Sequence, residues 1–314
     1  MLLIRRMVMP VSGRILRIER LSPFDGDGLR TVVFLKGCPL ACRWCSTPES
    51  QRQGVDFGVS RNKCTGCFSC VAACPEAVLE WDVKAQRFTT DPSRCTDCRA
   101  CIHACPAGAR TAWGYTATTE EIFNEVQKDS LFYFHSGGGV TVSGGEPLMQ
   151  AEFVSELLEK CLEIGINTAV ETSGQVPWKH IKSVLPLIDT LFYDLKHMDD
   201  SRHAALTGAG NTRILNNLRQ IDASGDEFNL IVRMPVIPGL NDDNENINAL
   251  RDVCSGLSRL SEIQLLPYHR LGIETYRSLS VPYLLENLSS PGMAEMDRYA
   301  DGLRQAGLTV KIGG

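Results

Sequence analysis

The sequence has no long apolar run. No segment of its 314 residues approaches the roughly 18 consecutive apolar residues that a membrane-spanning helix requires. The apolar stretch within residues 1–13 is short and is interrupted by Arg5 and Arg6, so it does not predict a signal peptide either. We therefore expect a cytoplasmic protein with no membrane partner.

A strong charge of one sign is also missing. Lysine and arginine number 32 against 37 aspartate and glutamate residues, which gives a net charge of −5 with both signs interspersed. No basic patch of the kind that binds nucleic acid stands out, so a nucleic-acid partner is not expected. Apolar residues make up 43% of the chain, enough for one large domain, or a large and a small one, with a buried core.

Cysteine is abundant and clustered. The chain has 13 cysteines, and 11 of them fall between Cys38 and Cys105. An odd number of tightly grouped cysteines does not resemble the disulfide framework of a secreted protein. In a reducing compartment such groups indicate metal sites.

From about residue 118 the chain alternates between helical and strand patterns. Thr119 is predicted to cap a helix that runs to Lys128. Strands that alternate with helices favour a parallel sheet with crossover helices, in a closed or partial barrel, and such folds build their sites just after the strands. The predicted strands cover residues 14–20, 31–35, 139–142, 167–170, 187–195, 229–234, 262–266 and 308–312, and further helices cover 151–164, 212–224, 243–257 and 293–306.

The first metal motif is a C-x3-C-x2-C run formed by Cys38, Cys42 and Cys45. Three thiolates on one short loop can ligate three irons of a [4Fe–4S] cluster and leave the fourth iron open to a non-protein ligand. The alternatives are a zinc loop or a structural cluster completed by a distant cysteine. Cys161 and Cys254 are the candidates for that ligand, but both lie in helix-like apolar stretches, where a free cysteine is usually a small core residue.

A second block, residues 52–112, contains the bacterial ferredoxin run C-x2-C-x2-C-x3-C-P twice. In two-cluster modules the fourth cysteine of each run ligates the other cluster. A zinc site fits poorly, because zinc sites use spaced pairs of ligands. We expect the block to relay electrons, with a purely structural role as the alternative. One cluster is assigned to Cys64, Cys67, Cys70 and Cys105, and the other to Cys95, Cys98, Cys101 and Cys74.

The Cys38 loop, followed by Gly144-Gly145-Glu146 after a predicted strand, resembles the radical S-adenosylmethionine (SAM) superfamily. The resemblance implies that the open iron binds SAM and that an electron from the cluster cleaves it to a 5′-deoxyadenosyl radical. It also implies that the Gly-Gly-Glu backbone binds the SAM amino group, and that Trp44 packs near the cluster and the adenine.

Two further segments resemble the glycyl-radical-enzyme activases, namely residues 25–30 (Asp-Gly-Asp-Gly-Leu-Arg) and 136–139 (Ser-Gly-Gly-Gly). The resemblance covers roughly residues 13–312, in the subgroup with a ferredoxin insert. It implies an α/β fold: a partial (β/α)6 TIM-like barrel from residues 13–51 and 113–314, with an inserted ferredoxin-like domain at 52–112.

The function implied is that of an activase. It cleaves SAM reductively and removes a hydrogen atom from a backbone glycine of a partner glycyl radical enzyme. A flavodoxin or ferredoxin supplies the electron. The cofactors implied are three [4Fe–4S] clusters, SAM and a monovalent cation. The subgroup serves enzymes that act on glycerol, diols, choline, isethionate or hydroxyphenylacetate.

The resemblance also implies roles for single residues. Asp25 faces the incoming glycine loop, with a solvated turn residue as the alternative, and His269 contacts SAM unless it is structural. A monovalent cation beside the SAM carboxylate is assigned to Glu171 with Thr172 and to Asp194. The SAM carboxylate itself is assigned to Lys196 and Arg233. Glu171 stands where the family usually has aspartate, which puts the cation in doubt.

Two other functions are weighed. One is a radical SAM enzyme that matures another protein or peptide, or acts on a small molecule. Peptide maturases usually carry auxiliary clusters after the barrel, and here only Cys161 and Cys254 follow Cys105. The other is an electron-transfer protein, which leaves the Cys38 loop and the Gly-Gly-Glu turn unexplained.

Overall fold

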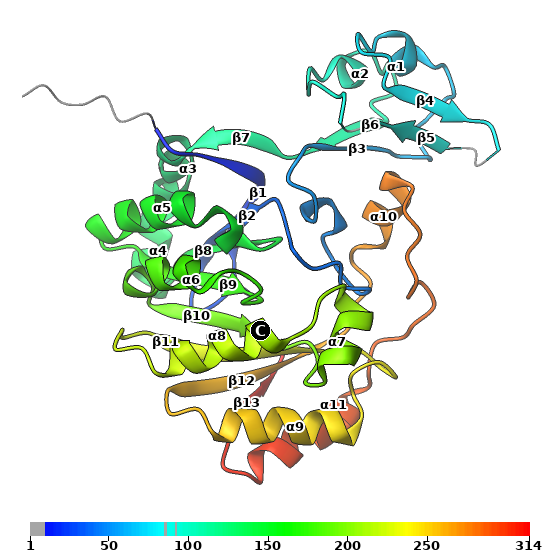
Figure 1. The fold of residues 1–314 in the computed structure, drawn as a ribbon. Helices are drawn as coiled ribbons and strands as arrows, with labels where there is room; N and C mark the ends of the chain where they lie inside the picture. The colour runs from blue at the N-terminus through cyan, green and yellow to red at the C-terminus, as the bar shows by residue number, and fades with distance from the viewer. Residues whose placement is uncertain (1–9, 85–86, 92) are drawn as a thin grey trace, which may run out of the picture.

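The computed structural model describes residues 10–84, 87–91 and 93–314; residues 1–9, where no signal peptide is predicted, lie outside it. Nine strands of the described chain form one sheet, in the order β13-β12-β11-β10-β9-β8-β2-β1-β7 (Figure 1). They are β1 (Ser12–Ser22), β2 (Arg30–Leu35), β7 (Tyr115–Thr118), β8 (Gly139–Gly144), β9 (Asn167–Thr172), β10 (Thr190–Asp194), β11 (Asn229–Val236), β12 (Leu260–Pro267) and β13 (Val310–Ile312).

The sheet is parallel from β2 through β8 to β13, and β1 runs antiparallel between β2 and β7. The end strands β13 and β7 do not pair with each other within the described residues, so the barrel stays open. The predicted α/β fold with a partial parallel barrel is confirmed.

Helices cover the outer face of this sheet (Figure 1). Their apolar sides pack on strand residues such as Val142, Val170 and Val232, all fully buried. The helices along the barrel are α3 (Thr119–Val126), α4 (Ser130–Ser136), α5 (Ala151–Glu163), α6 (Trp178–Val184), α7 (Asp200–Thr207), α8 (Thr212–Asp222), α9 (Asn244–Ser255), α10 (Ile273–Leu279) and α11 (Met293–Arg304), with short 3-10 turns η1 (Pro48–Ser50), η2 (Gln127–Asp129), η3 (Pro147–Gln150) and η4 (Leu185–Leu187).

The predicted cap of α3 is wrong by one residue. Thr118, with extended backbone, accepts a bond from Glu121 N, while the Glu121 carboxylate accepts one from Thr118 N at 2.7 Å. This reciprocal capping box satisfies two otherwise free N–H groups. Thr119 is instead buried, and its hydroxyl donates to Glu156 of α5.

The insert is reached through a two-stranded ribbon, β3 (Asp56–Val59) with β6 (Arg110–Trp113), at the upper right of Figure 1. It holds the hairpin β4 (Leu79–Asp82) and β5 (Arg87–Thr90), and two short helices, α1 (Ser69–Ala72) and α2 (Ala100–His103). The α10 helix packs against β3. The insert therefore contacts the segment of the barrel that follows β12.

Candidate active site

Side chains along each parallel strand alternate between the apolar outer layer and the inside of the barrel. Val170 faces the helices, so the next residue, Glu171, faces inward, and the same alternation turns Asp194 and Arg233 inward. Asp194 pairs with Arg233 in the sheet register, and Arg233 pairs with Gln264 of β12. Charged and polar groups from four strands therefore meet near the carboxyl edge.

The Cys38 loop begins at this edge, directly after β2, and is held on two sides. On one side Cys38 N donates to Gln51 O at 2.9 Å. On the other, Ala41 N donates to Thr207 O of α7 at 2.7 Å. Burial raises the pKa of the Cys38 and Cys42 thiols to about 12, so they ionise readily only when a metal binds them.

Gly144-Gly145-Glu146 closes over the start of the Cys38 loop. Glu146 N donates to Gly37 O at 2.7 Å, and a Cβ on Gly145 would stand 2.3 Å from that same oxygen. Glycine is therefore required for the two backbones to approach each other. The turn therefore positions the cysteine loop.

The Glu146 side chain is fully buried and fully used. Its carboxylate accepts bonds from Thr172 Oγ1 at 2.7 Å, Ser173 N at 2.9 Å, Ser173 Oγ at 2.7 Å and Leu148 N at 3.1 Å. Burial raises the pKa of Glu146, and these bonds oppose the shift. Glu146 and Thr172 thus tie the end of β8 to the end of β9, and their side chains contact each other.

Glu171 is engaged by two residues of this chain. Its carboxylate accepts bonds from the Ser143 hydroxyl and the Arg233 guanidinium. The Arg233 Nε donates to Gln264 at 2.7 Å, but Arg233 Nη2 is buried without a hydrogen-bond partner. Burial raises the pKa of Glu171, Arg233 lowers it, and the charge of Asp25 raises it again.

Lys196 lies between a carboxylate and the cysteine loop. Its Nζ is 2.8 Å from Asp194. Burial lowers the pKa of Lys196, but Asp194 and the nearby Cys42 outweigh burial and raise it above the usual value. The lysine is therefore a permanent cation beside the cysteine loop.

Trp44 and His269 lie in different surroundings. Trp44 is buried against Leu206, Ile237 and Tyr268, and it anchors the cysteine loop to the segments after β11 and β12. His269, after β12, is exposed, and its Nδ1 accepts a bond from Leu271 N at 3.4 Å. A contact of either side chain with SAM stays a prediction.

Asp25 lies on a loop folded into the barrel. Its carboxylate accepts a bond from the Ser22 hydroxyl, and its carbonyl accepts one from Thr141 Oγ1 at 2.8 Å. A Cβ on Gly138 would stand 1.9 Å from Leu29 O, so the glycine run makes a close contact with this loop. Asp25 is half-buried near Glu171, and its contact with an incoming glycine loop stays a prediction.

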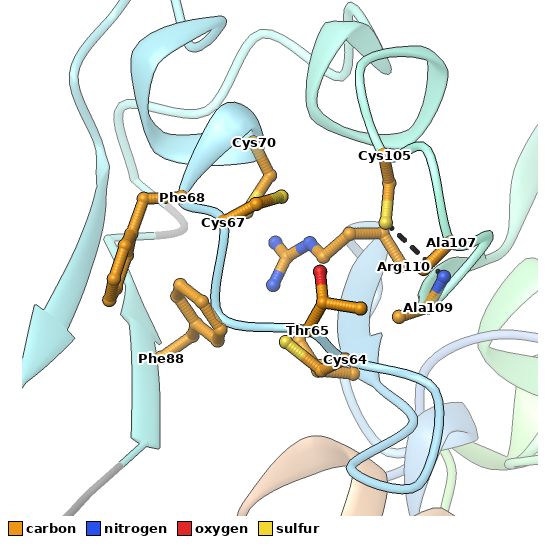
Figure 2. Close-up of a pocket in the computed structure, with 11 residues that line it drawn as sticks. Cys64, Thr65, Cys67, Phe68, Cys70, Phe88, Cys105, Ala107, Ala109 and Arg110 are labelled. Atoms are coloured by element: carbon orange, nitrogen blue, oxygen red, sulfur yellow. Dashed lines mark hydrogen bonds between the residues drawn. The ribbon is translucent and has the colours of Figure 1, made fainter.

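The eight cysteines of the insert surround two cavities in the crossed grouping. Cys64, Cys67, Cys70 and Cys105 line one cavity, which Figure 2 shows. Cys74, Cys95, Cys98 and Cys101 line the other. Phe68 and Phe88 shield the first cavity with apolar surface.

Each cavity is lined by four cysteines, which is the number of thiolates that a four-iron cluster takes, one on each iron. Cys161 and Cys254 are buried in α5 and α9 among apolar side chains, as expected for small core residues.

Sequence reasoning missed several residues around these sites. Lys36, fully buried, pairs with Asp56 at the entrance to the insert, with a distance of 2.8 Å. Arg110 lines both cysteine cavities of the insert. The sequence marked these residues only by their positions: a lysine directly before the Cys38 loop and an arginine within the apolar stretch after Cys105.

Family comparison agrees with this geometry. The radical SAM superfamily matches residues 92–250, and a 4Fe-4S dicluster domain matches residues 63–109. The first match starts inside the second and omits the Cys38 loop, so the structure, and not that match, places the loop at the barrel edge. The fold and the cysteine sites define a radical SAM enzyme with an inserted dicluster domain.

Comparison with named relatives defines the family more narrowly. The chain is 43% identical to the (2S)-3-sulfopropanediol dehydratase activating enzyme of Klebsiella oxytoca, over 88% of each chain. It is 42% identical to the isethionate sulfite-lyase activating enzyme of Oleidesulfovibrio alaskensis, over 85% of this chain and 87% of the relative. A solved domain of a pyruvate-formate lyase-activating enzyme from Bacteroides vulgatus is 31% identical, with a TM-score of 0.48, over 56% of this chain and 99% of that one.

The chain belongs to the glycyl-radical-enzyme activating enzymes of the radical SAM superfamily. The predicted activity, SAM cleavage followed by hydrogen abstraction from a glycine of a partner enzyme, is confirmed at this level. Iron–sulfur clusters and SAM are its cofactors. None of the helices in the described residues has the length and apolar character to cross a membrane.

Proposed function

We propose that this activase binds SAM where β2 and β8–β12 end, with Cys38, Cys42 and Cys45 holding a cluster that leaves one iron for SAM. The supporting observation is that Lys196 and Arg233 lie at the same edge as the cysteine loop. The bound cluster and SAM supply the deoxyadenosyl radical, while the chain binds and orients the reactants.

The carboxylate of SAM is assigned to Lys196 and Arg233. Arg233 is buried and the Lys196 side chain is 12% exposed, and the unpartnered Nη2 of Arg233 leaves one donor for a ligand. Charge-assisted bonds of this kind are stronger than neutral ones. The backbone of Gly144, Gly145 and Glu146 remains the proposed site for the SAM amino group.

Arg233 takes the place of a monovalent cation in this proposal. The Glu171 carboxylate is already bonded to Arg233 and Ser143, which satisfies its charge and two of its lone pairs. An added cation next to Arg233 would meet like-charge repulsion. Activity is therefore expected to be independent of the choice of monovalent cation in the buffer.

The insert, proposed to span residues 52–112, holds two further clusters that relay electrons from a flavodoxin or ferredoxin. Cys95 lines a cleft between insert and barrel together with Gln51 and Tyr276. Burial raises the pKa of Cys45, a hydrogen bond from the Gln51 side chain opposes the shift, and Tyr276 lies near Cys45. The Cys95 group is therefore proposed as the last step before the Cys38 loop.

The partner is proposed to be a glycyl radical enzyme acting on a small hydroxylated or sulfonated metabolite, on the basis of the two activating enzymes that are 42–43% identical. The test is anaerobic incubation with reductant, SAM and a candidate partner deuterated at its glycines. We expect deuterium in 5′-deoxyadenosine and an organic radical signal on the partner. The amount of deuterium transferred should be larger with a sulfopropanediol dehydratase or an isethionate lyase than with a choline lyase.

Two outcomes would contradict different parts of the proposal. If SAM is not cleaved, the assignment of the Cys38 loop fails. If SAM is cleaved and no deuterium is transferred from any partner in the panel, the choice of partner fails and the SAM site stands.

A further inference from the structure

Arg110 is a buried arginine between the two cysteine cavities of the insert. It begins β6 and is 5% exposed. The same side chain lines the cavity of Cys64, Cys67, Cys70 and Cys105 and the cavity of Cys74, Cys95, Cys98 and Cys101. Figure 2 shows its guanidinium directed into the space among the cysteines of the first group.

The charge of Arg110 has no acidic partner among the described side chains. Its Nε is buried without a hydrogen bond, and the guanidinium carbon lies 5.5 Å from the centre of the Phe88 ring. A buried, unpaired cation is strongly unfavourable unless anions surround it. The thiolates of the two cysteine groups are the anions available on both sides.

The pKa of Cys70 reports the same proximity. Burial raises the pKa of this thiol, and the positive charge of Arg110 opposes the shift. A cluster with four thiolate ligands is an anion, and reduction adds one more negative charge. A fixed positive charge beside it therefore favours the reduced form and raises its reduction potential.

We propose that Arg110 is shared by the two inserted clusters and raises the reduction potentials of both. The inference rests on the proposed assignment of the eight cysteines as cluster ligands. Its consequence is functional, because higher potentials let the insert accept electrons from a biological donor. Arg110 acts through the clusters and is a positioning residue of the electron relay.

The test measures reduction potentials by anaerobic titration followed by electron paramagnetic resonance. A Cys42→Ala background removes the signal of the SAM cluster, so that the inserted clusters are observed alone. Arg110→Gln is expected to lower the ratio of reduced to oxidised cluster about tenfold at a fixed potential. This corresponds to a reduction potential that is lower by about 59 mV for a one-electron step. Arg110→Lys should stay near the parent, and Arg61→Gln, which removes an exposed arginine of the insert, should change nothing.

A further variant guards against a failure to assemble clusters. Arg110→His carries a charge that can be switched in one protein, so its potentials should rise on acidification through pH 6–7, beyond any change in the parent. Unchanged potentials in Arg110→Gln with both clusters present, or a parent-like pH profile in Arg110→His, would overturn the role of Arg110. Fewer than about eight irons per chain in the Cys42→Ala background would instead overturn the cluster assignment.

Discussion

Arg233 and Glu171 form an ion pair inside the barrel although 62 residues separate them in the sequence. Phe192, on the strand between them, lies under the pair, with its ring centre 3.6 Å from the guanidinium carbon. The pair is held by stacking, by Ser143 on one side and by Gln264 on the other. Arg233 is thus fixed in place before any ligand arrives.

Arg233→Lys tests this arrangement. Lysine keeps the charge but loses the planar fork that serves Glu171, Gln264 and a ligand at once. We expect KM for SAM to rise about tenfold with a smaller change in kcat, since roughly 1.4 kcal/mol corresponds to a factor of ten. The measurement is the rate of 5′-deoxyadenosine formation against SAM concentration.

Arg259→Lys is the matched control for that variant. The guanidinium carbon of Arg259 also stacks on a phenylalanine, 4.8 Å from the centre of the Phe228 ring. Arg259 precedes β12, however, and so lies at the opposite edge of the sheet. Its replacement should leave KM for SAM unchanged. Equal effects of the two variants would show that the loss at Arg233 is one of general stability.

Cys42→Ala should abolish SAM cleavage and remove about four irons per chain, while about eight remain in the insert. The reason is that Cys38 and Cys45 are then the only thiolates left on the loop. Cleavage with dithionite and total iron are measured together. Cys254→Ala, a buried free thiol in α9, is the control, and cleavage surviving in Cys42→Ala would refute the loop assignment.

Gly145→Ala should also remove the SAM cluster selectively, in this case by displacing the backbone of the cysteine loop. The new methyl group would stand 2.3 Å from Gly37 O and would push the cysteine loop away from β8. We expect loss of the SAM cluster with the inserted clusters retained, measured as iron content and cluster spectra. Gly302→Ala, at an open position in α11, should keep all clusters; a full cluster complement in Gly145→Ala would contradict the close-contact argument.

The charge of Lys196 should not titrate in the working pH range. Its pKa is raised above the usual 10.5, so the cation is fully present at lower pH and is lost only as pH rises through the raised value. KM for SAM should therefore show no lysine titration between pH 6.5 and about 9. A rise in KM with a midpoint below pH 9, absent in Lys196→Arg, would show that the lysine is not held as a cation.

Asp56→Ala should destabilise the junction between insert and barrel. Lys36 is fully buried, and removing its partner leaves an uncompensated charge, at a cost of about 3 kcal/mol. The midpoint of anaerobic thermal unfolding should fall by roughly 6–12 °C. Arg52→Ala removes the exposed partner of the same aspartate, 3.1 Å away, and should cost less than about 1 kcal/mol. Equal losses would mean that Lys36 does not depend on Asp56.

Local patterns account for the predictions that held. Apolar residues recur every two positions in a strand and about every 3.6 positions in a helix, so both could be located in the sequence. Their alternation then predicted the parallel barrel. The predicted cap at Thr119 failed because adjacent threonines look alike in sequence. The backbone conformation decides between them, and only Thr118 is extended.

The sequence by itself predicted the grouping of the insert cysteines, because in two-cluster modules the fourth cysteine of each ferredoxin run belongs to the other group, and the two cavities have this crossed grouping. Tertiary structure alone decided which charges meet. Glu171 with Arg233 and Lys36 with Asp56 come from segments distant in sequence. Arg110 follows Cys105 closely, but only the fold brings it to both cysteine groups. Sheet register and burial decide the partner of each of these charges, because a buried charge without a partner is strongly unfavourable.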